Sequence, residues 1–171
     1  IPKRDWSSDV CSSDLSVVSH YFASKHDLLL SAYRQRMERI VTRIDFAKLE
    51  GQPLSQVLSA ALPIDELGHE NWRIWLAFWG LATTDEFFRL EQRQRSREAV
   101  DLFQRAILAT GIMEEGEHSY LVAQALLSAA SGIATQAVYD PERWPPERQI
   151  KLLELNIAAH VGEAALFAPA G

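Results

Sequence analysis

The sequence predicts an all-α protein. Apolar residues recur near the 3.6-residue helical period along most of the 171-residue chain. Capping residues, prolines and glycines separate these stretches, and no segment alternates apolar and polar residues as a half-buried strand would. The composition, 47% hydrophobic and 23% charged, is ordinary for a globular protein, so a sizeable core can be buried.

Residues 1–15 have no helical or strand periodicity and look foreign to the rest of the chain. Asp5 to Leu15 reads DWSSDVCSSDL, which can be back-translated into a string resembling a sequencing-library adapter. We interpret residues 1–15 as an artefact, expect them to be disordered and exclude them from fold reasoning. The alternative is a natural Ser/Asp-rich tail. The only cysteine, Cys11, lies in this stretch and therefore carries no inference about redox chemistry or metal binding.

The first predicted helix follows a capping box, with Ser24 as N-cap and Asp27 three residues later. An apolar stripe continues it: Leu28, Leu29, Ala32, Tyr33, Met37, Ile40, Val41 and Ile44. Gly51, Gln52 and Pro53 break the pattern. Pro53 can open a short second helix, which Pro63 closes.

A third helix is predicted from about His69 to Thr83. Its apolar residues fall on more than one face: Trp72, Trp75, Leu76 and Trp79 on one, Phe78 and Leu81 on another. A helix with this pattern should be buried. Thr84 and Asp85 can cap the next helix, which has a charged middle and ends at Gly111.

Two further helices complete the chain. The helix from about Glu117 to Tyr139 is rich in Ala, Ser and Gly, which makes it a candidate for close contact between helices, and Asp140-Pro141 ends it. The last helix is predicted from about Glu147 to Phe167, with Ile150, Leu153, Ile157, Val161 and Ala164 on one stripe.

The charge distribution is uneven. The net charge is −6, yet Lys25, Arg34, Arg36, Arg39 and Arg43 outnumber the acidic residues between Ser16 and Arg43. A local basic element on an acidic body can bind DNA, since only the contacting face has to neutralise phosphates. The alternative is a solvated helix face.

The segment from Ser16 to Leu29 (SVVSHYFASKHDLL) resembles the junction of helices 3 and 4 in the TetR family of transcriptional repressors. Its Val-Val-Ser-His-Tyr-Phe form is similar to the choline-responsive, BetI-like branch. So are Trp75–Trp79, Gly132–Gln136 and the segment from Asp140 to Arg148, although Ser131 stands where the branch usually has Asp. The resemblance covers Ser16 to Val161.

This resemblance implies a TetR-like helical bundle with a truncated helix-turn-helix at the N-terminus. Residues 16–45 would be the remnant of the DNA-binding domain, and residues 46–171 the ligand-binding and dimerisation domain. The helices that support a recognition helix are missing before Ser16, so we expect this chain to bind DNA weakly or not at all.

The resemblance also implies candidate site residues. Ser19, His20, Tyr21 and Lys25 would contact operator DNA in the intact protein, and Lys25 lies in a helix first turn that favours phosphate. Trp72, Trp75, Phe78 and Trp79 would line an effector pocket, with polar contacts from Tyr120 and Gln136. A choline-like effector would bind over the indole faces. The alternative is that these aromatic residues are ordinary core.

The expected partners are operator DNA, a small-molecule effector and a second copy of the chain, with no cofactor and no metal. We expect no apolar run of membrane-spanning length and no signal peptide, and therefore a cytoplasmic protein with no membrane partner. The 5 histidines are scattered and no catalytic motif is present, so we expect no enzyme activity. The alternative function is a helical small-molecule-binding or dimerisation module without DNA binding.

Overall fold

The computed structural model describes residues 28–35 and 52–166, and every regular element within them is helical, as predicted. Residues 28–35 form one helical segment. The labelled helices are α4 (Leu54–Ser59), α5 (Glu66–Thr84), α6 (Glu86–Ala109), α7 (Glu117–Tyr139), α8 (Pro146–His160) and the 3-10 helix η1 (Glu163–Leu166).

Capping aspartates set where α5 and α6 begin. Asp65 precedes α5, and its side chain accepts a hydrogen bond of 2.6 Å from the Gly68 amide. This cap places the start of α5 earlier than the expected His69. Asp85 caps α6 as predicted, accepting a hydrogen bond of 2.9 Å from the Phe87 amide. Because Asp85 alone joins the two helices, the chain turns sharply between them.

Helix α8 ends at His160, so the prediction that it continues to Phe167 is wrong. Gly162 adopts a φ of 109°, which L side chains rarely adopt and which breaks the helical ladder. The short 3-10 helix η1 follows it. Local backbone geometry at a glycine therefore overrides the apolar stripe that suggested a longer helix.

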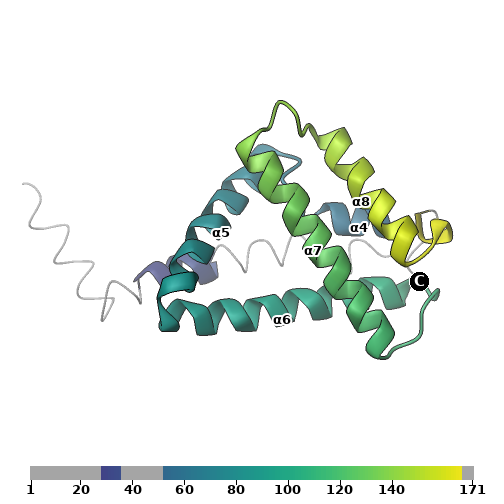
Figure 1. The fold of residues 1–171 in the computed structure, drawn as a ribbon, viewed down its shortest axis with the longest axis horizontal. Coiled ribbons are helices and arrows are strands. Elements are labelled where there is room, and N and C mark those ends of the chain that lie inside the picture. The colour runs from purple at the N-terminus through teal and green to yellow at the C-terminus, as the bar shows by residue number, and fades with distance from the viewer. Residues whose placement is uncertain (1–27, 36–51, 167–171) are drawn as a thin grey trace, which may run out of the picture.

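Figure 1 shows α5, α6 and α7 arranged as the sides of a triangle, with α8 beside α7 and the 28–35 segment near the turn between α5 and α6. The main core lies where α4, α6, α7 and α8 meet. Its fully enclosed side chains come from all four helices: Leu54, Ile107, Leu126, Leu153 and Ile157. A second, smaller core joins the 28–35 segment to α5 and α6: Leu30, Tyr33, Phe78, Ala82 and Phe88.

Among the described residues, α7 alone is long and apolar enough to cross a membrane. The expectation that no apolar run reaches this length is therefore wrong, because the small residues of α7 leave a long stretch without charge. A core helix passes the same test of length and composition. Helix α7 packs against α5, α6 and α8, and its Ala123, Leu126 and Ala134 are fully enclosed, so it serves here as a core helix.

Candidate functional site

Helix α5 carries the tryptophans singled out by the sequence. Trp72 meets Trp75 edge to face at 4.7 Å between ring centroids and Trp79 edge to face at 5.8 Å. Its indole Nε1 donates a hydrogen bond of 2.8 Å to the carbonyl oxygen of Ala61. Trp72 is only 4% exposed and belongs to the main core, whereas Trp75 and Trp79 are half-buried at its edge.

Phe78 lies in the second core, separate from the main core that contains Trp72. Its ring stacks on that of Tyr33 with centroids 3.7 Å apart, and Phe88 meets it edge to face at 5.3 Å. Phe78 is 4% exposed. Trp72 and Trp79 thus go with the main core and Phe78 with the second, while Trp75 packs against both. Phe78 holds the 28–35 segment against α5.

Tyr120 and Gln136 are not brought together. Both lie on α7, and at a rise of about 1.5 Å per residue their backbones are separated by roughly 24 Å along the helix. Tyr120 is half-buried against the main core, and Gln136 is exposed. A single small ligand therefore cannot contact both residues in this arrangement.

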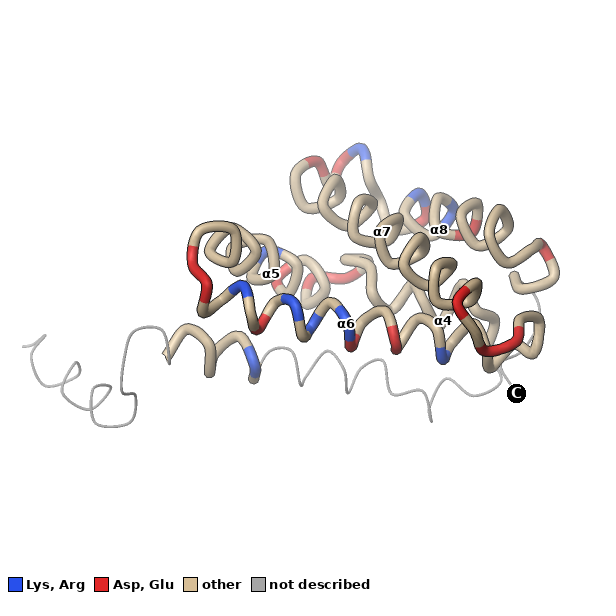
Figure 2. The backbone as a smooth tube through the Cα atoms, turned by 60° about the horizontal axis from the view of Figure 1, so that its bottom comes forward, with Lys and Arg blue, Asp and Glu red and all other residues tan. Residues whose placement is uncertain are grey.

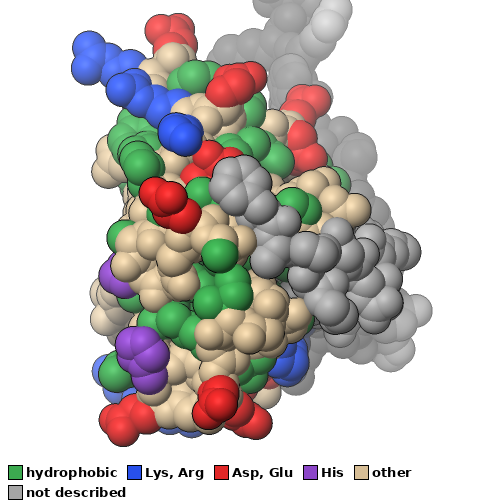
Figure 3. Space-filling view, turned by 90° about the vertical axis from the view of Figure 1, so that its right-hand side faces the viewer, with side chains coloured by type: hydrophobic (Ala, Val, Ile, Leu, Met, Phe, Trp, Pro, Cys, Tyr) green, Lys and Arg blue, Asp and Glu red, His purple; other side chains and the backbone are tan. Residues whose placement is uncertain are grey.

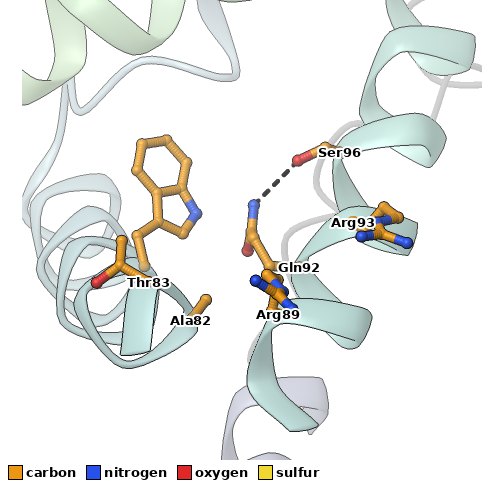
Figure 4. A pocket seen from close by; sticks show the side chains of 7 residues that line it. Ala82, Thr83, Arg89, Gln92, Arg93 and Ser96 are labelled. Carbon is orange, nitrogen blue, oxygen red and sulfur yellow. Dashed lines mark hydrogen bonds between the residues drawn. The ribbon is translucent and has the colours of Figure 1, made fainter. Parts of the chain in front are cut away.

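An open hollow of about 430 Å³ lies between α5 and α6. From α5 it is lined by Trp79, Ala82 and Thr83, and from α6 by Arg89, Gln92, Arg93 and Ser96. Both sets recur at three- and four-residue intervals, so each represents one helix face. Figure 4 shows Gln92 and Arg89 projecting from α6 toward the α5 side of the hollow.

The α6 side of the hollow was not among the predicted ligand-binding residues. Its members lie in the charged middle of the helix, which resembles any solvated face in sequence. The available clue was the spacing of Arg89, Gln92, Arg93 and Ser96, which places them on one side of the helix. What lies opposite them depends on how α5 and α6 pack, and spacing does not determine that.

Gln92 connects the hollow to the 28–35 segment. Its Nε2 donates a hydrogen bond of 3.1 Å to the Ser96 hydroxyl, and its Oε1 accepts one of 3.0 Å from the Tyr33 hydroxyl. Burial raises the pKa of Tyr33 well above its ordinary value, so the phenol remains protonated and able to donate. A change at Gln92 therefore reaches Tyr33 through a direct contact.

Glu91, the neighbour of Gln92, is held by two arginines. Its carboxylate lies 2.6 Å from a guanidinium nitrogen of Arg34 and 2.9 Å from Nε of Arg95. Arg95 also reaches Glu98 at 2.8 Å. The hydrogen bond from Arg34 holds the pKa of Glu91 below its ordinary value, supported by Arg95, while desolvation acts in the opposite direction. This ion-pair cluster is a second tie between the 28–35 segment and α6.

The predicted DNA-binding residues Ser19, His20, Tyr21 and Lys25 lie outside the described residues. Within the part of the chain that the structure describes, no three His, Cys, Asp or Glu side chains are grouped closely enough to hold a metal ion.

The fold and the hollow together define a class of protein, a helical body with an open hollow between two of its helices. Phe78, Glu91 and Gln92 of this body contact the 28–35 segment, which leads toward the N-terminus. The family model of the BetI-type transcriptional repressor C-terminal domain matches residues 51–162. The chain therefore belongs to the BetI-type branch of the TetR family of transcriptional regulators.

Curated relatives support this assignment. The chain is 29% identical over 133 residues to the HTH-type transcriptional regulator BetI of Vibrio parahaemolyticus, a match covering 74% of this chain and 65% of the relative. The BetI protein of Vibrio vulnificus is 26% identical over 134 residues, with the same coverage. The chain thus spans 65% of the length of the curated relatives it matches.

A solved structure has the same fold. A transcriptional regulator from Rhodococcus sp. Rha1 superposes with a TM-score of 0.74 at 22% sequence identity, covering 85% of this chain and 78% of that one.

Proposed function

We propose that this chain is the effector-binding and dimer-forming body of a transcriptional repressor that a small molecule releases from its operator. The observation that carries the proposal is the connection from the α5–α6 hollow through Gln92 to Tyr33. The 28–35 segment lies in the helix that, by the family resemblance, follows the recognition helix. A ligand at the hollow is therefore one side chain away from the element that positions DNA-binding residues.

The proposed mechanism is a shift between two arrangements of that segment. A ligand that alters Gln92 or the ring stack at Phe78 favours one position of Tyr33 over the other. In a dimer, moving the segment changes the separation of the two recognition helices, so they no longer match half-sites one helical turn apart. Ligand and DNA affinities are then coupled reciprocally.

The dimer is proposed on the outward faces of α7 and α8. Leu121 is 54% exposed and Tyr139 is 72% exposed on α7, and Leu155 is 56% exposed on α8. Between the first two, Ser128 and Gly132 are exposed, so a second helix can approach closely. Figure 3 shows apolar side chains reaching the surface between charged ones on the side where α7 begins and α8 ends. Apolar surface of this kind favours an interface with a partner chain.

A choline-like effector, the class expected from the resemblance, would have to use Trp75 and Trp79. A quaternary ammonium binds over an exposed indole face, and Trp72 is enclosed by the core. The test is a titration of choline against the Trp75→Ala and Trp79→Ala variants. Loss of choline binding in both, with Trp144→Ala unchanged, would support this effector class, and binding that both variants retain would exclude the indole faces.

The proposed loss of DNA binding is tested by rebuilding the N-terminus. The source gene is sequenced upstream of codon 16, and the recovered segment replaces residues 1–15. We expect the rebuilt protein to shift its operator in a mobility-shift assay with a Kd on the order of 10⁻⁸ M, and the 171-residue chain to give no specific shift. Specific operator binding by the 171-residue chain would contradict the proposal.

The alternative is a helical ligand-binding or dimerisation module without a DNA role. Genomic DNA that encodes residues 1–15 as they stand would favour it. The family is one of transcriptional regulators, not typically enzymatic, and we propose no catalytic activity for this chain. We also propose a cytoplasmic location, because a repressor must reach its operator.

A further inference from the structure

The side chains that line the α5–α6 hollow offer donors and positive charge. Its lining includes Arg89 and Arg93 and no aspartate or glutamate. Arg89 pairs with Glu86 one turn earlier on α6, where both side chains are exposed. Arg93 makes no ion pair with the described part of the chain. An arginine without a counter-ion at the edge of a hollow is a site for a carboxylate, which its planar guanidinium binds in a bidentate manner.

Gln92 and Trp79, which also line the hollow, likewise offer hydrogen-bond donors. The Oε1 of Gln92 is already occupied by the Tyr33 hydroxyl, which leaves the amide nitrogen of Gln92 facing Ser96. The indole N–H of Trp79 makes no hydrogen bond within residues 28–35 and 52–166. The hollow therefore has donors to spare and few free acceptors, so it selects a ligand that accepts hydrogen bonds.

The α5 wall presents the apolar side chains of Trp79 and Ala82 beside Thr83. Trp79 is half-buried and Ala82 is 7% exposed, so an apolar group placed against them loses contact with water on one side. The hollow has a volume of about 430 Å³ and is open to solvent, so a small ligand would keep one side in water. Figure 2 shows basic and acidic residues interspersed along the first half of α6, so the positive charge at the hollow is local on a chain of net charge −6.

We infer that this hollow binds a small carboxylate with a flat apolar body. The carboxylate lies against Arg93 and the donors of α6, and the apolar body packs on Trp79 and Ala82. If this ligand is the effector, the inference replaces the choline-like class expected from the resemblance and in that respect rests on the proposed repressor function. The binding site itself does not depend on that function, because it can be measured without DNA.

The test is a calorimetric or ligand-observed NMR titration of the 171-residue chain with benzoate as the probe. Benzamide keeps the shape and removes the charge, and benzyltrimethylammonium reverses the charge. We expect benzoate to bind about tenfold more tightly than benzamide, because one charge-assisted hydrogen bond to the carboxylate changes the Kd by about that factor. We expect benzyltrimethylammonium not to bind at the hollow.

The variants are Arg93→Gln and Arg93→Lys, with Arg105→Gln as the matched control. Arg93 and Arg105 are both exposed residues of α6, and Arg105 is outside the lining. We expect Arg93→Gln to weaken benzoate binding about tenfold, Arg93→Lys to retain part of it, and Arg105→Gln to leave it unchanged. The urea midpoint of each variant confirms that it is folded.

Equal affinity for benzoate and benzamide, or benzoate binding that Arg93→Gln leaves intact, would overturn the inference. So would a preference for benzyltrimethylammonium that Arg93→Gln strengthens. The operator assay on the rebuilt protein separates the two proposals. Arg93-dependent benzoate binding with no operator binding under any condition supports the site and contradicts the repressor function.

Discussion

Tyr33 and Gln92 are joined by a hydrogen bond of 3.0 Å across 59 residues of sequence, and the two ends of this bond belong to different parts of the molecule. Tyr33 lies on the segment that leads toward the N-terminus, and Gln92 lines the α5–α6 hollow. The Tyr33 ring also stacks on Phe78, so hydrogen bonding and packing hold the same side chain in place. This residue is where the two halves of a repressor would be coupled.

Tyr33→Phe should separate the hydrogen bond from the ring stack. We expect it to lower the free energy of unfolding by about 1 kcal/mol, the usual net value of one hydrogen bond, because the stack on Phe78 remains. Urea denaturation measures the change. Tyr139→Phe, at a side chain that is 72% exposed, is the control and should change nothing. An unchanged stability of the Tyr33 variant would show that the hydrogen bond contributes nothing.

Glu91→Gln should weaken the second tie between the 28–35 segment and α6. The Glu91 side chain is 6% exposed and accepts from both Arg34 and Arg95. Hydrogen bonds to a charged group contribute more than neutral ones, so we expect a loss of about 2 kcal/mol in denaturant unfolding. Glu154→Gln removes a surface ion pair with Lys151 and serves as the control, with a change below about 0.5 kcal/mol. An equal loss of unfolding free energy in the two variants would show that the burial of Glu91 does not strengthen its ion pairs.

The contribution of Glu91 should depend on pH in a defined direction. Its folded-state pKa is held below the ordinary value of 4.5, first by Arg34 and then by Arg95. The stabilisation is therefore present in full above about pH 4.5 and is lost as the pH falls through the folded-state pKa. We expect the stability gap between the native chain and Glu91→Gln to be constant near neutral pH and to narrow in acid. A stability gap that widens in acid would contradict the lowered pKa of Glu91 in the folded state.

Gln149→Glu should be among the most damaging single substitutions. Gln149 is fully buried at the start of α8, where its Nε2 donates to the carbonyl oxygens of Trp144 at 2.8 Å and Pro63 at 3.3 Å. A carboxylate cannot donate to either, and burying its charge costs free energy, so we expect a loss above about 3 kcal/mol at neutral pH.

Lowering the pH should reduce this loss, because a neutral carboxylic acid can donate one hydrogen bond. Thermal unfolding across a pH series measures it. Gln124→Glu, at an exposed position of α7, is the matched control and should have little effect. A pH-independent loss would indicate that the shape of the side chain matters more than its charge.

Charged substitutions on the outward faces of α7 and α8 should dissociate the proposed dimer. Leu121→Glu and Leu155→Glu each place a charge in an exposed apolar position, and together they should shift sedimentation equilibrium from dimer to monomer. Leu90→Glu, at a residue of α6 that is 53% exposed, is the control and should leave the dimer intact. A monomeric native chain would contradict the proposed interface.

Much of the secondary structure was determined by the sequence alone. The helices from Glu86 and from Glu117 begin where capping and composition predicted, and the second of these ends at Tyr139 as expected. These features depend on residues a few positions apart, which local spacing encodes. The departures, the earlier start of α5 and the earlier end of α8, come from the cap at Asp65 and the left-handed backbone at Gly162.

Only the tertiary structure decided the site. Spacing places Phe78 and Trp72 on different faces of α5, but packing decides that Phe78 meets Tyr33 while Trp72 enters the main core. Packing also brings Gln92 and Arg93 of α6 and Trp79 of α5 into the lining of one hollow. Contacts between residues far apart in the chain depend on how whole helix faces pack. The apolar period of one helix shows which of its faces is buried, but not which other helix packs against that face.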